Sequence, residues 1–296
     1  IANQQKLDFL LVTDHNTLKG RQEGKARRYG KTLVLIDNEI STESGHYLAL
    51  RTPEELPPDQ PVSQTIQQVK AFGGLGFVPH PNWPKSRWKD RKARGFIGIE
   101  IYNAAEVAAL RRRPWAALFS TLFFGMDVAA LSWLERPDLT LAWWDQLLQE
   151  GPMVGIGATD AHGLQWLGLQ LAPYGPLFKL VRNHLWVKSE VSSDSIYEAL
   201  EKGRLFVAHD LLADSTGFQF LAQRAGSIEA VMGEAVRLKA GLELAVYLPA
   251  PGEILLMRDG KEAGKVVGQQ GLFPVTQPGV YRVEARREGR PWIYSN

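Results

Sequence analysis

The sequence feature that most constrains the fold is a repeated pattern, a short apolar run that ends in a histidine or a carboxylate. The runs and their polar residues are 8–13 before His15, 33–40 around Glu39, 75–79 before His80, and 153–158 before Asp160 and His162. Apolar runs of about four to eight residues are typical of buried strands. We therefore expect several buried strands whose ends carry nitrogen and oxygen donors.

Helical segments separate these strands. Residues 62–72 place apolar side chains at helical spacing and end at Gly73, and residues 104–150 form a longer helical region. Residues 46–51 alternate in polarity and are expected to pair with the strand before them, whereas 184–188 are predicted to form the last strand of this unit. Strands that alternate with helices predict a parallel sheet or a barrel. In an α/β barrel the active site lies at the carboxyl ends of the strands, where the donors are expected here.

The pattern of apolar and polar residues changes after about residue 216. Short alternating runs follow one another, and Asp259-Gly260 predicts a hairpin turn between the runs that flank it. Closely spaced short strands are typical of a small β-sandwich. We therefore predict an α/β domain over residues 1–216 and a C-terminal β-sandwich domain over residues 217–296.

The amino-acid composition excludes several kinds of site and partner. The chain has no cysteine, which excludes thiolate ligands, thiol nucleophiles and disulfides. Its 34 basic and 32 acidic side chains leave a formal charge of +2, which gives no general attraction to nucleic acid, so no nucleic-acid partner is expected. The compartment, cytoplasmic or periplasmic, and the oligomeric state stay open.

One segment is long and apolar enough to be compared with a membrane span. Residues 114–134 contain a single charged residue, Asp127, near the middle. A carboxylate at the centre of a bilayer costs roughly 3 kcal/mol, and several hydroxyl-bearing and small residues dilute the segment further. We therefore expect one or two buried helices here and no membrane span.

The donors themselves indicate a metal centre. His46 lies seven residues after Glu39, and Asp160 lies two residues before His162. Histidines together with carboxylates suit zinc, manganese or iron, and catalytic centres leave coordination positions for water. Each short motif alone is a weak signal, but the motifs follow apolar runs and can therefore meet at one rim.

These motifs, in this order, resemble those of the PHP (polymerase and histidinol phosphatase) metallohydrolases. The matching segments are VTDHNT (12–17), NEIST (38–42), GHYLAL (45–50), GFVPHP (76–81), IEIYN (99–103) and GATDAHG (157–163). The resemblance covers residues 1 to about 210, and the tail PGVYRVEARREGRPWIYSN is similar to the C-terminal β domain of the carbaryl-hydrolase-like subgroup. It implies a distorted seven-stranded β/α barrel that binds two or three divalent metal ions, zinc, manganese or iron.

The resemblance also implies a role for each matching donor. The metal ligands would be His15, Glu39, His46, His80, Asp160 and His162, with Glu39 bridging metals. The family opens with a strand that ends in His-x-His before the TDH motif, whereas the 14 residues before His15 contain no histidine. We therefore expect an N-terminally incomplete barrel that lacks its first strand, and a centre with two fewer imidazoles.

Basic residues follow the motif that contains His80. Six cations lie between Lys85 and Arg94. The functional interpretation is an electrostatic clamp for phosphate, with Arg87 nearest in sequence. The alternative is an ordinary solvated loop.

Two kinds of side chain near these motifs are candidates for substrate contact. Trp83 and Trp88 could stack on a base or line a pocket. Asn103 ends the IEIY strand, where it could touch the substrate or make a turn. His184 and His209 fit no metal motif and are predicted to be structural.

Together these features favour metal-dependent hydrolysis of a small-molecule phosphoester, in which two metals activate a hydroxide that attacks phosphorus. Glu39, Asp160 and Arg87 are the expected catalytic residues. One alternative is hydrolysis of a carbamate or carboxylic ester at the same metals. Another is a ligand-binding protein without catalysis.

Overall fold

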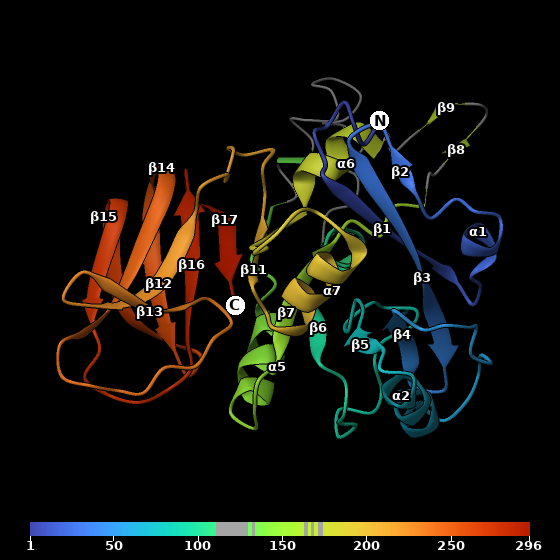
Figure 1. Cartoon of the computed structure of the whole chain (residues 1–296), viewed down its shortest axis with the longest axis horizontal. Helices are drawn as coiled ribbons and strands as arrows, with labels where there is room; N and C mark the ends of the chain where they lie inside the picture. The colour runs from blue at the N-terminus through green and yellow to red at the C-terminus, as the bar shows by residue number, and fades with distance from the viewer. Residues whose placement is uncertain (111–129, 132–133, 163–164, 167–168, 171–173) are drawn as a thin grey trace.

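The computed structural model describes residues 1–110, 130–131, 134–162, 165–166, 169–170 and 174–296. Two large sheets organise them, together with the short pair β8 (Gln165–Trp166) and β9 (Leu169–Gln170). In Figure 1 the strands of the first sheet run from blue to green, and the C-terminal strands form a separate orange and red group beside them. The fold is a mixed α/β structure with a second, antiparallel sheet.

The first sheet has the strand order β1-β3-β4-β5-β6-β7, with β2 paired to β3. Its strands are β1 (Phe9–His15), β2 (Arg28–Tyr29), β3 (Thr32–Thr42), β4 (Gly45–Leu50), β5 (Leu75–Val78), β6 (Gly98–Asn103) and β7 (Val154–Ala158). β1 is parallel to β3, and β5, β6 and β7 are parallel to one another. The sheet is curled (Figure 1), so the carboxyl ends of these strands approach one another at one rim.

β4 is the exception to the parallel arrangement and runs antiparallel to both of its neighbours. The cause is its short connection to β3, because a two-residue turn can join only antiparallel strands. The pairing predicted for residues 46–51 is confirmed, since Glu39 lies opposite Leu48 and Ser41 lies opposite His46. Alternate residues of a strand share one face, so this register places the His46 side chain on the same face as Glu39.

Helices pack beside the first sheet. They are α1 (Lys19–Gln22), α2 (Val62–Ala71), α3 (Ala104–Leu110), α5 (Asp138–Leu148), α6 (Tyr174–Leu180) and α7 (Ser193–Glu201). α2, predicted over residues 62–72, buries Val62, Ile66 and Val69, and α5 buries Trp144 and Leu147. Each buried side chain of this size stabilises the fold by about 1.5–3 kcal/mol.

The candidate span over residues 114–134 lies mostly outside the described residues, as does Asp127. Of this segment the structure describes residues 130–131 and 134, where Ala130 and Leu134 are buried in the core of the first sheet. No helix within the described residues is long and apolar enough to cross a membrane.

The second sheet is antiparallel, with the order β10-β11-β17-β16-β14-β12-β13 and β15 paired to β14. Its strands are β10 (Arg182–Leu185), β11 (Leu205–Ala208), β12 (Gln219–Arg224), β13 (Ser227–Val231), β14 (Leu242–Arg258), β15 (Lys261–Pro274), β16 (Tyr281–Arg287) and β17 (Arg290–Ser295). The hairpin predicted at Asp259-Gly260 is confirmed, because Arg258 pairs with Lys261. Both turn residues have positive φ, 52° and 77°, as a tight hairpin turn of the primed type requires.

One strand prediction was wrong. The segment 184–188 was expected to continue the first sheet, but β10 pairs with β11, which in turn pairs with β17 near the end of the chain. Two asparagine side chains cover the edge of β7 that such a strand would have used. Strands of the second sheet thus begin before residue 217, and the domain boundary at that position stays a prediction.

Candidate metal centre

Five strands of the first sheet bring the predicted donors to its rim. His15 ends β1 and lies opposite Glu39 of β3 in the parallel register. His46 follows on β4, His80 lies two residues after β5, and Asp160 lies two residues after β7. The local sequence explains the placement of His15, His80 and Asp160, because each follows an apolar run and emerges where the buried strand ends. Glu39 and His46 lie within β3 and β4 and are brought together by the pairing of these two strands.

Glu39, His46 and His80 form a compact triangle of donor atoms. Glu39 Oε1 lies 2.8 Å from His46 Nδ1 and 3.0 Å from His80 Nε2, and the two ring nitrogens are 3.1 Å apart. Donors on one tetrahedral zinc, each about 2.0–2.1 Å from the metal, lie about 3.3 Å from one another. The triangle therefore has nearly the size of one face of a metal coordination shell.

A second group of donors adjoins this triangle. His162 Nε2 lies 3.4 Å from His15 Nε2, and an Asp160 carboxylate oxygen lies 3.4 Å from His162 Nδ1. His15 Nδ1 is 3.9 Å from Glu39 Oε1, and His15, Glu39 and His46 have donor atoms that all lie within 4.8 Å of one another. Glu39 thus lies between the two groups, where a bridging carboxylate is expected.

The two groups differ in burial. Glu39 is 6% exposed and His80 is 3% exposed, whereas the His15 and His162 side chains are exposed. The carbonyl oxygen of Asp160 lies 2.9 Å from His162 Nδ1 and orients the ring so that Nε2 faces His15. The centre therefore has a buried floor and an open side through which water or substrate could enter.

The buried residues of the centre, Glu39 and His80, have strongly shifted pKa values. Burial alone would raise the pKa of Glu39, but hydrogen bonds from His46 and His80 outweigh it and lower the pKa to about 2. Burial alone would lower the pKa of His80, but the hydrogen bond to Glu39 and the charge of Glu100 raise it to about 9. Without metal, His80 is thus a protonated partner of the Glu39 carboxylate. A metal ion would take the place of that proton.

Glu100 is a site residue that the sequence analysis did not single out. Its carboxylate accepts hydrogen bonds from the His80 backbone N–H and from Asn103 Nδ2, both at 2.8 Å. Asn103 Nδ2 also lies 3.3 Å from Asp160 Oδ2. Complete burial raises the pKa of Glu100 to about 8. The one available signal was a carboxylate inside an otherwise apolar strand, FIGIEIY.

Asn103 is engaged inside the protein at both ends of its amide. Its nitrogen bonds Glu100 and Asp160, and its oxygen accepts the backbone N–H of Glu106 at 2.8 Å, which caps α3. Asn103 was predicted either to touch the substrate or to make a turn; these bonds support a structural role where β6 gives way to α3, and the substrate contact stays a prediction. Asn103 links the strand end of β6 to the carboxylate that follows β7.

Three residues beside or within the donor set have positive φ although none is glycine. They are Asn16 at 55°, His80 at 27° and Asp160 at 51°. Such backbone conformations cost of order 1–3 kcal/mol each and persist only where the surroundings fix them. Asn16 is fixed through Ser41, since its side chain accepts the Ser41 backbone N–H at 2.8 Å and donates to the Ser41 hydroxyl at 3.0 Å.

Two asparagine amides secure β7, the strand that precedes Asp160. Asn183 of β10 accepts the Gly157 N–H at 2.8 Å and donates to the Gly157 carbonyl at 2.7 Å. Asn296, the last residue described, makes the same pair of bonds with Gly155, at 2.7 and 2.9 Å. These amides form hydrogen bonds with the backbone N–H and carbonyl groups at the outer edge of β7, as a neighbouring strand would. The second sheet therefore helps to position the Asp160 segment.

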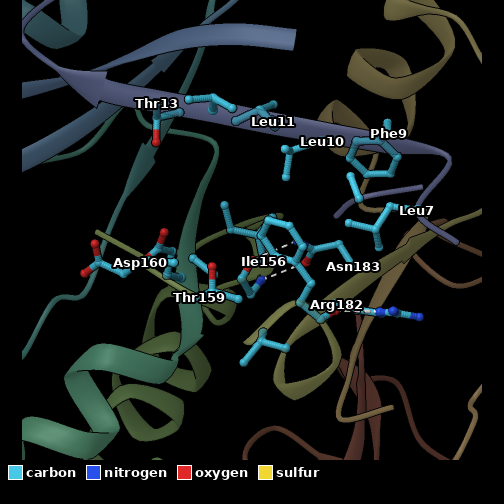
Figure 2. Close-up of a pocket in the computed structure, with 18 of the residues that line it drawn as sticks. Leu7, Phe9, Leu10, Leu11, Thr13, Ile156, Thr159, Asp160, Arg182 and Asn183 are labelled. Atoms are coloured by element: carbon cyan, nitrogen blue, oxygen red, sulfur yellow. Dashed lines mark hydrogen bonds between the residues drawn. The ribbon is translucent and has the colours of Figure 1, made fainter. Parts of the chain in front are cut away.

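A cavity of about 870 Å³ opens beside the centre, and His15, Glu39, His80, Glu100, Asp160 and His162 line one part of it. Figure 2 shows Leu10 and Leu11 of β1 facing Ile156 across this cavity, with Asp160 toward one end and Arg182 toward the other. The Arg182 guanidinium is paired with Asp210 at 3.1 Å. The donors therefore border an accessible space whose remaining walls are largely apolar.

The cations of the basic segment, residues 85–94, differ in their contacts. Arg94 pairs with Glu150, with contacts of 2.5 and 2.7 Å, whereas the Arg87 side chain is exposed and lies outside the residues that line the cavity. The Arg87 carbonyl lies 3.5 Å from the position that a Cβ on Gly45 would take, so the segment passes directly beside the residue before His46. The clamp role of Arg87 stays a prediction.

The two histidines predicted to be structural lie apart from the donors. His184 Nε2 is 3.0 Å from Asp210 Oδ2 and 3.1 Å from the Ser215 hydroxyl, and its ring stacks on Phe206. His209 is fully buried, and burial lowers its pKa to about 4. Both rings are held by contacts within the protein, as their predicted structural role requires.

Comparisons with known proteins give distant likenesses. No family model matches the sequence. An uncharacterised protein of Methanocaldococcus jannaschii is 32% identical over 113 residues, which are 35% of this chain and 63% of that protein, so the chain spans less than two thirds of that relative. A two-domain protein from Bacteroides vulgatus, described as containing a predicted PHP-like metal-dependent phosphoesterase, aligns with 100% of this chain and 87% of its own length, with a TM-score of 0.45 and 15% identity. A likeness this remote carries no argument, so the function must be argued from the donors.

Proposed function

We propose that this chain is a metal-dependent hydrolase, and that its reaction is hydrolysis of a phosphoester at a di- or trinuclear centre. The observation that carries the proposal is the triangle of Glu39, His46 and His80, with donor atoms 2.8–3.1 Å apart and with His15 and His162 beside it. Ring nitrogens 3.1 Å apart repel one another unless a proton or a metal ion lies between them. Nitrogen and oxygen donors of this kind suit zinc, manganese or iron.

Bound divalent cations would supply Lewis acidity and lower the pKa of a water molecule toward neutrality. The residues of this chain would then divide the remaining work. Glu39 would hold two cations through one carboxylate, and His80 would release its proton when metal binds. Asp160, held by Asn103, would fix the orientation of the attacking water. Arg87 and its neighbours would neutralise negative charge on the phosphate.

The direct test is hydrolysis by the full chain after reconstitution with Mn²⁺ or Zn²⁺, using nucleotides, sugar phosphates and bis-p-nitrophenyl phosphate. We expect turnover of at least one of them, and we expect Glu39→Gln to lower it by roughly 100-fold or more. Glu150→Gln is the matched control, because Glu150 is an exposed carboxylate that pairs with Arg94. A protein that binds metal and turns over none of these esters would exclude the phosphoesterase assignment.

The likeness of the C-terminal tail to the carbaryl-hydrolase-like subgroup supports a second candidate, hydrolysis of a carbamate or carboxylic ester at the same metals. A carbonyl substrate carries less negative charge than phosphate. The double variant Arg87→Gln, Lys89→Gln should therefore spare carbamate turnover and damage phosphate turnover. A third candidate, a ligand-binding protein without catalysis, would be favoured if the native protein bound less than about one metal per chain.

A further inference from the structure

The two tryptophans of the segment after His80 lie in different environments. Trp88 is 2% exposed and packs near Tyr47 and Phe96, with ring centroids 6.4 and 6.2 Å away. Trp83 remains partly exposed, and its ring centroid lies 6.1 Å from that of His80. Trp88 therefore belongs to the core, whereas Trp83 presents aromatic surface beside a candidate metal ligand.

The backbone turn that carries Trp83 is fixed before any ligand binds. Its backbone N–H donates to the His80 carbonyl at 2.9 Å, which closes a turn over Pro81 and Asn82. Arg91 also stabilises this turn, because its guanidinium donates to the Pro81 carbonyl at 3.0 Å and to Asn82 Oδ1 at 2.7 Å. A surface that is already ordered loses little conformational entropy when a ligand stacks on it.

The charges around Trp83 suit an anion. Lys85 and Arg87 are exposed, and within the described part of the chain neither makes an ion pair with a carboxylate. Lys89 donates from its backbone N–H to the Ser44 carbonyl at 2.8 Å, which draws the basic segment over the hairpin that leads into His46. A partly exposed indole beside a candidate metal ligand, in a segment that also carries exposed cations, suits a flat aromatic ring attached to a phosphate.

We propose that Trp83 is a stacking platform for the substrate, and that the substrate class is phosphoesters that carry a planar aromatic ring, such as a nucleobase. The proposal rests on the proposed phosphoesterase function for the position of the ester, and on Trp83 alone for the aromatic part. A purely structural Trp83 would only shield His80 from water. That role would affect every substrate equally.

The test uses two substrates whose phosphate is attached to a ribose 5-oxygen and which differ in the nucleobase, guanosine 5′-monophosphate and ribose 5-phosphate. We expect the wild-type metal-loaded protein to prefer the nucleotide in kcat/KM. Trp83→Ala should lower kcat/KM for the nucleotide by roughly 10-fold or more, mainly through KM, and leave ribose 5-phosphate within about twofold. Trp83→Phe should restore most of the loss. Trp186→Ala is the matched control, because Trp186 is also a partly exposed tryptophan, 40% exposed.

A binding measurement separates the two proposals. Guanosine 5′-monophosphate should quench the tryptophan fluorescence of the wild type more than ribose 5-phosphate does, and Trp83→Phe should weaken this response. If the wild type hydrolyses neither of these substrates nor the other esters named above, the phosphoesterase assignment fails, and the quenching alone decides the role of Trp83. Equal losses on both substrates in Trp83→Ala, or unchanged nucleotide binding, would overturn the stacking proposal and leave the hydrolase proposal intact.

Discussion

Two clusters of ionisable side chains in this molecule differ in how their charges are paired. At the contact between α5 and β16, Arg282 pairs with Asp145 through two contacts of 2.8 Å, and Arg136 pairs with Glu284 at 2.6 and 2.7 Å. A further contact of 2.7 Å joins Arg282 to Glu284. Cations and carboxylates alternate, so each charge meets an opposite one. This cluster joins the helices of the first sheet to the second sheet.

The candidate metal centre lacks this balance. His46 meets His80 nitrogen to nitrogen at 3.1 Å, and His15 meets His162 in the same way at 3.4 Å. Asp160 has the Asn103 amide and the His162 ring nearby instead of an arginine. One cluster therefore stabilises the fold as it stands, whereas the other brings together imidazoles and carboxylates that suit a metal cation under the function proposed above.

The largest effect is expected from Glu39→Gln, which removes the carboxylate between the two donor groups. Metal content and hydrolytic rate should each fall by roughly 100-fold or more. The midpoint of denaturant unfolding in the presence of a chelator should also fall, because the buried His80 imidazole loses the carboxylate that pairs with it in the metal-free protein. Metal analysis and unfolding of the same sample check both results. Full metal content in the variant would contradict the bridging position of Glu39.

Arg282→Ala tests the balanced cluster and should affect stability alone. Asp145 and Glu284 would each lose a partner, and Glu284 is 2% exposed, so the free energy of unfolding should fall by about 3–5 kcal/mol. Metal content per folded chain should stay unchanged. Denaturant titration followed by circular dichroism measures the first quantity. A large loss of metal without a loss of stability would show that the Arg282 cluster supports the metal centre and not the fold.

Asn183→Ala tests whether the second sheet supports the centre. The Gly157 N–H and carbonyl would lose their partners, at a cost of about 1–3 kcal/mol in stability. Metal affinity should fall by roughly 10-fold, because β7 positions Asp160 and His162. Asn183→Asp keeps the acceptor for the Gly157 N–H and loses the donor, so it should lie between the wild type and the alanine variant. Unchanged metal affinity in Asn183→Ala would make this contact purely structural.

The smallest expected effect is the pH dependence of the metal-free protein. The pKa of Glu39 falls from 4.5 to about 2 on folding, so its stabilising contribution is present above pH 4.5 and is lost as the pH falls toward 2. The pKa of His80 rises from 6.5 to about 9, so its contribution is present below pH 6.5 and is lost as the pH rises through 9. The pair should therefore stabilise most between pH 4.5 and 6.5.

Denaturant unfolding with a chelator, measured from pH 4 to pH 9, checks this profile. Glu100 reinforces the alkaline side, because its pKa rises from 4.5 to about 8 through burial and its deprotonation favours the unfolded chain. In His80→Gln the His80 part of the alkaline loss should disappear, and the part due to Glu100 should remain. An identical pH profile in wild type and His80→Gln would show that His80 and Glu39 do not form the pair described here.

The sequence predicted the parts of the site that depend on local pattern. The donors after apolar runs were foreseeable because a buried strand must end where polar residues begin, and this holds for His15, His80 and Asp160. Glu100 was missed because a carboxylate in an apolar strand differs little, in sequence, from an isolated polar residue. Its role appears only when the β5–His80 turn folds over β6.

The long-range contacts could not be predicted from local pattern. β10 joined the second sheet because β11 pairs with β17, almost ninety residues later, as in Ala208 with Ile293. The bond from Asn296 to Gly155 likewise spans 141 residues. Local periodicity defines strands, but it does not specify which distant strand completes an edge. For the same reason the balanced cluster between α5 and β16 was not foreseen.

The most direct test of the account is the metal content and ligand environment of the full-length native protein, measured by elemental analysis together with X-ray absorption spectroscopy. We expect at least about one divalent zinc, manganese or iron per chain, with imidazole nitrogens and carboxylate oxygens about 2.0–2.2 Å away. Glu39→Gln should lose most of that metal. A wild type that holds well under one metal per chain after reconstitution, or whose metal lacks imidazole ligands, would contradict the central claim that these donors share cations.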